Sequence, residues 1–156
     1  VDVAMVYAIA RQESAFAPQA QSSAGAQGLM QLMPDTARRT ARRLGLEFDF
    51  QRLLDPEYST QLGAAHLRDL MEDWKGSLIL IFASYNAGPA RIRRLREKAT
   101  ARGLEPNKWF NNVEIVAAES IGRETVQYVS NIYKYYLAYQ MAVEQMEERE
   151  RAKKAA

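Results

Sequence analysis

A single glutamate, Glu13, lies in line with an apolar helical face, where burying an ionised carboxylate would cost free energy. Val6, Ile9, Ala10 and Glu13 recur at helical spacing, so one face of the expected helix carries three apolar side chains and then this carboxyl group. Burial penalises an ionised carboxylate, whereas an acid with a raised pKa stays protonated near neutral pH and donates a proton. Taken alone, the position fits equally well a solvated, inert residue at the end of a helix.

The remaining composition restricts acid–base chemistry to carboxylates, tyrosines and lysines. The chain has no cysteine, which excludes disulfides, thiol nucleophiles and Cys-ligated zinc. His66 is the one histidine, so a two-histidine metal site is excluded, and its polar stretch, AAHLRDLMED, favours a surface or packing role over catalysis. We expect no metal and no cofactor. A net charge of +2 argues against nucleic-acid binding.

The length and composition predict one globular domain over residues 1–156, and we expect a monomer. Hydrophobic residues make up 47% of the chain and charged residues 26%. The longest apolar run, 78–83, is too short to cross a bilayer, and no signal peptide is recognised. The pattern begins inside a helix at Val1, as in a module taken from a longer protein. Residues 147–156 form a charged tail that we expect to be frayed or solvated.

Helical periodicity dominates the chain, so the fold class is all-α with little or no strand. Asp35 is expected to cap the second helix and Gly45 to end it, and Asp55 followed by Pro56 is typical of a helix start. Gly76-Ser77 and Gly88-Pro89 are expected to interrupt the pattern. The expected helices are 3–14, 36–44, 56–74, 78–86, 91–101, and 124 to the C-terminus, with loops around 15–25, 48–54 and 105–107.

Four short strings carry the remaining chemical signal: ES at 13–14, GLMQ at 28–31, SYNAG at 84–88, and ET at 124–125 followed by YV. Each alone has an ordinary structural explanation. In this order and spacing they resemble the catalytic domain of lytic transglycosylases of the soluble-lytic-transglycosylase type, which has a lysozyme-like (goose-type-lysozyme-like) fold. The ARQESAF, GLMQLMP, SYNAG and ESIGRETVQYV stretches carry this resemblance from Val3 to about Tyr139. Ser84 stands where alanine is usual.

The resemblance implies a role for each matched position. Glu13 becomes the catalytic acid, with a pKa raised by apolar surroundings from Phe16, Met30 and Met33. Tyr85 and Gln31 are expected to donate hydrogen bonds that orient the substrate's N-acetyl group, and Glu124 is expected to shape the site, with Glu119 as a competitor. The full set of implied substrate-binding residues is Ser22 (or Ser23), Gln31, Met33, Tyr85, Asn86 and Glu124.

The implied reaction is cleavage of the β-1,4 bond between N-acetylmuramic acid and N-acetylglucosamine in peptidoglycan, with a 1,6-anhydro product. Most glycosidases use two carboxylates, whereas here the substrate's own C6 hydroxyl would replace the second one. The segments NKWFNNVEIVAAE, GRETVQYV and IYKYYLAY look like the membrane-bound lytic murein transglycosylase F branch. That branch implies an N-terminal solute-binding-like domain and a periplasmic protein attached to the outer membrane, acting on glycan strands that carry stem peptides.

Two alternatives remain open from the sequence. A goose-type lysozyme-like hydrolase would need a second carboxylate or a positioned water, and the nearest acids in sequence are Asp35, Glu47 and Asp49. An inactive peptidoglycan-binding module is the other alternative, against which the intact set of motif residues argues. Most arginines of the two basic helices are expected to be solvated, although some could meet stem-peptide carboxylates.

Overall fold

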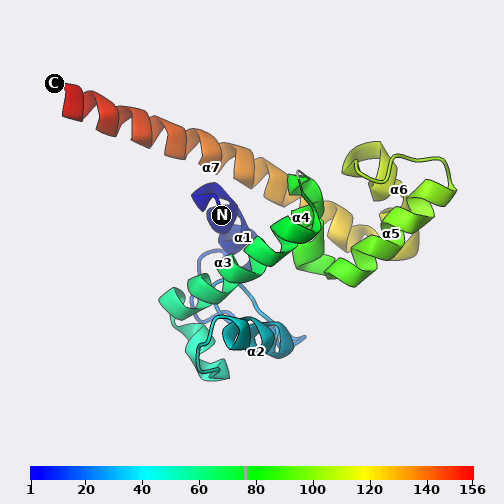
Figure 1. Ribbon diagram of the computed structural model, residues 1–156, viewed down its shortest axis with the longest axis horizontal. Helices are drawn as coiled ribbons and strands as arrows, with labels where there is room; N and C mark the ends of the chain where they lie inside the picture. The colour runs from blue at the N-terminus through cyan, green and yellow to red at the C-terminus, as the bar shows by residue number, and fades with distance from the viewer. Residues whose placement is uncertain (76) are drawn as a thin grey trace. The chain divides into compact units, whose positions relative to one another are not determined.

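A computed structural model describes residues 1–75 and 77–156, so Gly76, half of the predicted Gly76-Ser77 break, lies outside the described residues. Two compact units are distinguished: unit 1 comprises Val1–Ala64 and Ile132–Ala156, and unit 2 comprises Ala65–Asn131. The described residues form helices and turns without a β-strand, which confirms the all-α prediction. In chain order (Figure 1) the helices are α1 Val3–Ser14, α2 Pro34–Arg43, a 3-10 turn Phe50–Leu54, α3 Pro56–Asp73, α4 Leu78–Ala87, α5 Pro89–Ala101, a turn Trp109–Val113, α6 Glu114–Ser120 and α7 Arg123–Ala155.

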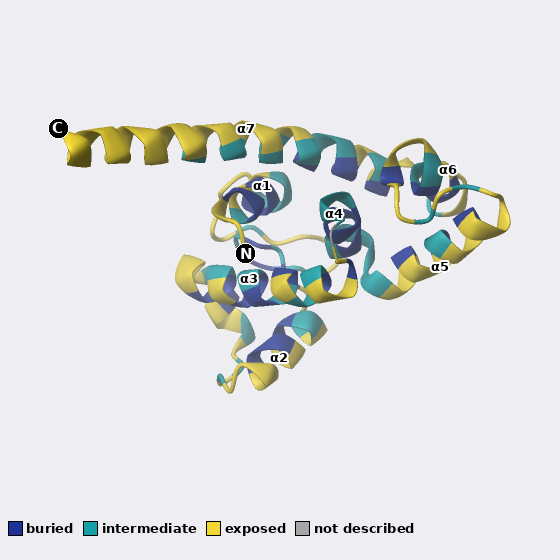
Figure 2. Cartoon of the chain, turned by 45° about the horizontal axis from the view of Figure 1, so that its top comes forward, coloured by how far each residue is buried: buried dark blue, intermediate teal, exposed yellow. Residues whose placement is uncertain are grey.

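Each unit has its own buried apolar side chains, which appear dark blue in Figure 2. Burial of such side chains provides most of the favourable free energy of folding. In unit 1 the fully buried residues include Ile9, Met30, Leu53, Leu62 and Ile132. In unit 2 they include Leu67, Leu70, Phe82, Ile92, Leu95 and Val113. Within the described part of the chain, no helix is long and apolar enough to cross a membrane.

Helix α1 has the predicted bounds, because both ends are capped. The Asp2 carboxylate accepts a hydrogen bond from the Ala4 amide at 2.9 Å, which satisfies one of the unpaired N–H groups at the helix start. At the other end Ala15 adopts the left-handed conformation, and its amide donates to the Arg11 carbonyl at 3.0 Å. The expected apolar stripe is buried at Ile9 and Ala10.

Helix α2 begins two residues earlier than predicted, and the expected Asp35 cap is wrong. The N-cap is Met33, and Pro34 takes the first helical position, where its fixed φ suits the helix and its missing N–H costs nothing. Asp35 therefore lies in the first turn and pairs with Arg38 at 2.9 Å. The C-terminal prediction is confirmed: Gly45 has φ 71°, and its amide and that of the next residue bond back to the last turn.

Helices α3 and α4 follow the prediction closely. The Asp55 carboxylate caps α3 by accepting from the Glu57 amide at 3.0 Å, with Pro56 at the first helical position. Helix α4 is buried from Leu80 to Ser84 and ends at Gly88. Helix α5 begins at Pro89 rather than at residue 91, because proline again occupies the first helical position.

The last part of the chain contains one helix that the sequence analysis missed, α6. Helix α7 begins at Arg123, as expected to within one residue, and continues to Ala155. Residues 147–156 are all exposed, and Figure 2 shows this end of α7 as exposed. The predicted tail is thus solvated, but it is helical in the structure rather than frayed.

Candidate functional site

The predicted site residues fall into two clusters, one in each unit, which are described separately. The first cluster comprises Glu13, Ser22, Gln31 and Met33 of unit 1. Glu13 is half-buried in the last turn of α1. The next residue, Ser14, places its hydroxyl 2.9 Å from the Ala10 carbonyl and 2.8 Å from the Leu29 carbonyl. This hydroxyl therefore joins the end of α1 that carries Glu13 to the turn that contains the GLMQ string.

Helix α1 is held by the part of α7 that belongs to unit 1. The Tyr136 hydroxyl donates to the Asp2 carboxylate at 3.1 Å, and the rings of Tyr7 and Tyr139 lie 5.6 Å apart. Arg11 donates to the Tyr139 hydroxyl at 3.4 Å, which raises the pKa of the guanidinium. Burial and the hydrogen bond to Asp2 raise the pKa of Tyr136. These contacts fix the position of α1 along its length.

The backbone is strained on both sides of this connection. Ala15 and Phe16, directly after the ES pair, have φ values of 51° and 63°, and Gln31 in the GLMQ turn has φ 50°. Left-handed backbone at residues other than glycine costs about 1–3 kcal/mol each and persists only where the surroundings enforce it. Such strain is concentrated at functional sites, so these turns support the choice of this region.

Gln31 holds the loop together, which corrects its expected role as a hydrogen-bond donor to substrate. Its side-chain nitrogen donates to the carbonyls of Ala20 and Gly28, both at 2.9 Å. An amide NH₂ has two hydrogens, so both donors are used within the protein. Only the acceptor oxygen of Gln31 is left to contact a ligand.

The glycine of the GLMQ string is required by close packing. Gly28 has φ 89°, and a Cβ added there would lie 2.0 Å from the Leu53 carbonyl oxygen. Since that oxygen belongs to the backbone, it cannot move aside for a side chain. Gly28 therefore sets the path of the turn that ends in Gln31.

The other two members of the first cluster are exposed. The Ser22 hydroxyl accepts from the Ala26 amide at 2.9 Å, so Ser22 closes its own turn. Met33 is 41% exposed at the N-cap of α2 and offers an apolar surface. Of the residues expected to surround Glu13, Phe16 packs edge-on against Tyr139 with the ring centroids 6.2 Å apart, and Met30 lies in the core.

The second cluster comprises Tyr85, Asn86 and Glu124 of unit 2. Tyr85 and Asn86 are half-buried in the last turn of α4. The Asn86 side-chain oxygen accepts from the hydroxyl of buried Thr125 at 2.7 Å, which brings the YNAG and ET strings together. Glu124, beside Thr125, is exposed in the first turn of α7. Its competitor Glu119 pairs with Arg102.

The sequence analysis gave His66 no functional role, yet it contacts this cluster. The imidazole of His66 on α3 lies against the ring of Tyr85, with centroids 5.4 Å apart and planes at 50°. The available signal was that His66 is the one histidine of the chain. Its neighbour is distant in sequence, so no local pattern reveals the contact.

Several arginines proposed as contacts for stem peptides have partners within the protein. Arg38 pairs with Asp35, and Arg93 pairs with Asp73 at 3.4 Å. Arg96 donates to the Pro106 carbonyl at 3.0 Å and lies over the Trp74 ring. Arg38 and Arg93 are exposed, in agreement with the expected solvated faces, whereas Arg96 is half-buried and joins α5 to the loop that contains Pro106.

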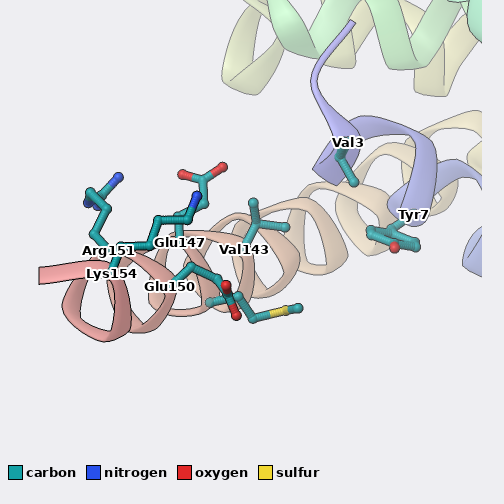
Figure 3. A pocket seen from close by; sticks show the side chains of 8 residues that line it. Val3, Tyr7, Val143, Glu147, Glu150, Arg151 and Lys154 are labelled. Carbon is teal, nitrogen blue, oxygen red and sulfur yellow. The ribbon is translucent and has the colours of Figure 1, made fainter. Parts of the chain in front are cut away.

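An apolar hollow lies at the opposite end of α1 from Glu13. Its volume is about 440 Å³, within the range of small-molecule sites. Figure 3 shows the side chains that line it, from the start of α1 and the end of α7: Val3, Tyr7, Val143, Met146, Glu147, Glu150, Arg151 and Lys154. It contains none of the predicted site residues. Among the described residues, no group of three or more histidine, aspartate and glutamate side chains is arranged to hold a metal ion.

Comparison with known proteins identifies the class of fold. The lytic transglycosylase Slt of Pseudomonas aeruginosa, solved as an inactive glutamate-to-glutamine mutant, superposes with a TM-score of 0.77 at 34% identity. The match covers 92% of this chain and 22% of that one. The fold is therefore lysozyme-like, as predicted.

The sequence comparisons identify the family. Residues 1–109 match the family described as the transglycosylase SLT domain. The soluble lytic murein transglycosylase of Salmonella typhimurium is 35% identical over 94% of this chain and 22% of its own length. The membrane-bound lytic murein transglycosylase F of Desulfosudis oleivorans is 32% identical over 86% of this chain and 32% of its own length. The chain belongs to the transglycosylase SLT domain family and spans about a fifth to a third of these relatives.

Proposed function

We propose that this domain cleaves the β-1,4 bond between N-acetylmuramic acid and N-acetylglucosamine in peptidoglycan and forms 1,6-anhydromuramoyl products. Family membership supports the reaction class, since the matched relatives are named lytic murein transglycosylases. The observation that carries the proposal is the strained end of α1, where the Ser14 hydroxyl ties the turn after Glu13 to the GLMQ turn. The inactive Pseudomonas mutant, in which glutamine replaces a glutamate, agrees with one essential glutamate.

In the proposed mechanism Glu13 acts twice. As a protonated acid it gives its proton to the glycosidic oxygen, the C1–O bond breaks, and the N-acetyl oxygen of the muramoyl residue stabilises the positive charge at C1. As a carboxylate it then takes the proton of the C6 hydroxyl, whose oxygen attacks C1. The bond from O6 to C1 closes the anhydro ring, Glu13 is protonated again, and no water is consumed. Such acid–base catalysis contributes about 10²–10⁴-fold.

The remaining predicted residues receive binding roles. In the first cluster we assign saccharide contacts to exposed Met33 and Ser22 and to the acceptor oxygen of Gln31. In the second cluster we assign Tyr85 and Asn86 to saccharide binding, with the amide of Asn86 oriented by Thr125. Glu124 is assigned a site-shaping role, which the ion pair of its competitor Glu119 with Arg102 supports.

The wider setting is also part of the proposal. We assign residues 1–156 to one catalytic domain acting on glycan strands and stem peptides at the bacterial cell wall, in the periplasm. The names of the membrane-bound relatives support attachment of the full-length protein to a membrane, for which we propose the outer membrane. A solute-binding-like partner domain, as in the F branch, and a monomeric state belong to the same proposal.

The experiment that tests the function measures the release of soluble muropeptides from purified peptidoglycan. Glu13→Gln is expected to lower the rate at least about 10²-fold, because an amide cannot donate or accept the proton. Glu57, which is exposed in the first turn of α3, provides the control, and Glu57→Gln should retain the parent rate. Release that is unchanged in Glu13→Gln would contradict the proposal, and absence of release by the parent domain would indicate a binding module.

A further inference from the structure

We infer that His66 is a positioning residue for Tyr85. The inference rests on the proposed function, in which Tyr85 binds saccharide. Both residues belong to unit 2: His66 lies in the second half of α3, and Tyr85 lies in the last turn of α4. Their ring centroids are 5.4 Å apart with the planes at 50°, within the range in which aromatic rings attract each other.

The burial pattern of α4 explains why Tyr85 needs such a contact. Residues Leu80 to Ser84 are buried, so the core fixes the helix up to Ser84. Tyr85 is the first residue of this stretch that is only half-buried, and core packing therefore encloses its ring incompletely. A partly enclosed ring can occupy more than one rotamer.

The last turn of α4 is held from two helices. The hydrogen bond from Thr125 of α7 to Asn86 anchors the residue next to Tyr85, at 2.7 Å. His66 of α3 contacts the Tyr85 ring itself. The first contact holds the side chain of the neighbouring Asn86, and the second lies against the Tyr85 ring and selects its direction. His66 thus acts on saccharide through Tyr85 without contacting it.

The size of the effect follows from the strength of aromatic pairs. Such a contact favours one arrangement over its alternatives by about 2- to 12-fold. Removing the ring in His66→Ala should therefore lower kcat/KM by up to this factor, since the fraction of Tyr85 in the competent rotamer falls by at most this amount. His66→Phe keeps an aromatic ring at this place and should restore most of the loss.

The test measures kcat and KM on soluble glycan fragments of alternating N-acetylglucosamine and N-acetylmuramic acid. The variants are His66→Ala, His66→Phe, Tyr85→Leu and the double variant His66→Ala/Tyr85→Leu. Met71→Ala is the matched control, since Met71 is also half-buried on α3. Unfolding temperatures are recorded for every variant, so that a loss of stability is separated from a loss of positioning.

Four results together would support the inference. His66→Ala lowers kcat/KM by about 2- to 12-fold and alters kcat and KM in the same proportion as Tyr85→Leu does. His66→Phe restores the parent values. In the double variant, His66→Ala has no effect beyond that of Tyr85→Leu. Met71→Ala keeps the parent kinetics.

Other results would overturn it. If Tyr85→Leu impairs the reaction but His66→Ala does not, or if the two losses multiply, His66 does not act through Tyr85, and the proposed function stands. If the parent domain is inactive or Tyr85→Leu is harmless, the proposed role of Tyr85 fails, and the inference fails with it.

Discussion

Replacing Gln31 with glutamate distinguishes a residue that holds the loop from one that donates to substrate. The two side chains have the same shape, but a carboxylate cannot donate to the carbonyls of Ala20 and Gly28, each 2.9 Å from the Gln31 nitrogen. Each lost hydrogen bond costs about 1 kcal/mol, so both cost about 2 kcal/mol. Repulsion between the carboxylate and the two carbonyl oxygens adds to this loss.

For a domain of this length the loss corresponds to a fall of about 4–8 °C in the unfolding temperature. Circular dichroism at neutral pH measures this change, beside Gln19→Glu as a control on an exposed residue of the same loop. At low pH the introduced carboxyl becomes protonated and regains one donor, so the deficit relative to the control should shrink. An unfolding temperature equal to that of the control, with activity lost, would refute the loop-holding role and restore Gln31 as a donor to substrate.

Three further predictions concern packing and ionisation. Gly28→Ala should lower the free energy of unfolding by about 3 kcal/mol or more, because the new Cβ would clash with the Leu53 carbonyl oxygen. Urea unfolding measures this loss, and a loss under about 1 kcal/mol would contradict the close approach of Gly28 to Leu53. Ser84→Ala should stabilise the domain by about 1 kcal/mol, since the buried Ser84 hydroxyl has no hydrogen-bond partner among the described residues. An unfolding temperature below that of the parent would contradict this and would mean that the hydroxyl makes a hydrogen bond. The raised pKa of Tyr136 contributes stability below about pH 10, and this contribution is lost as the pH rises through the pKa of the folded state. In Tyr136→Phe the free energy of unfolding should therefore fall less steeply above about pH 10 than in the parent. Parallel curves of this free energy against pH for parent and variant would contradict the prediction.

The sequence predicted most helices because their ends carry local signals. Asp55 followed by Pro56 and the glycine at position 45 act within a few residues, and the structure confirms both. The Asp35 cap failed because two start signals compete, and Pro34 places the helix start ahead of the aspartate. Helix α6 was missed because it has seven residues, and Val113 at its N-cap offers no capping side chain.

The candidate site was predictable in its strings but not in its contacts. The order and spacing of the ES, GLMQ, YNAG and ET strings led to the family resemblance that implies the site, and the structure contains hydrogen bonds that join ES to GLMQ and YNAG to ET. The partners of individual side chains depend on the path of the backbone. The GLMQ turn directs both donors of Gln31 to carbonyls, and His66 of α3 lies beside Tyr85 of α4 although the two residues are far apart in sequence. Sequence periodicity carries no information on either contact.

The measurement that tests the central claim most directly is mass spectrometry of the products formed from purified peptidoglycan, with Glu13→Gln as the control. An intramolecular reaction with Glu13 as the single acid and base predicts muropeptides about 18 Da lighter than their hydrolysed equivalents, the mass of one water. Glu13→Gln should yield none of them. Products at the hydrolysed mass would contradict the mechanism, indicate a lysozyme-like hydrolase, and require a second carboxylate or a positioned water opposite Glu13.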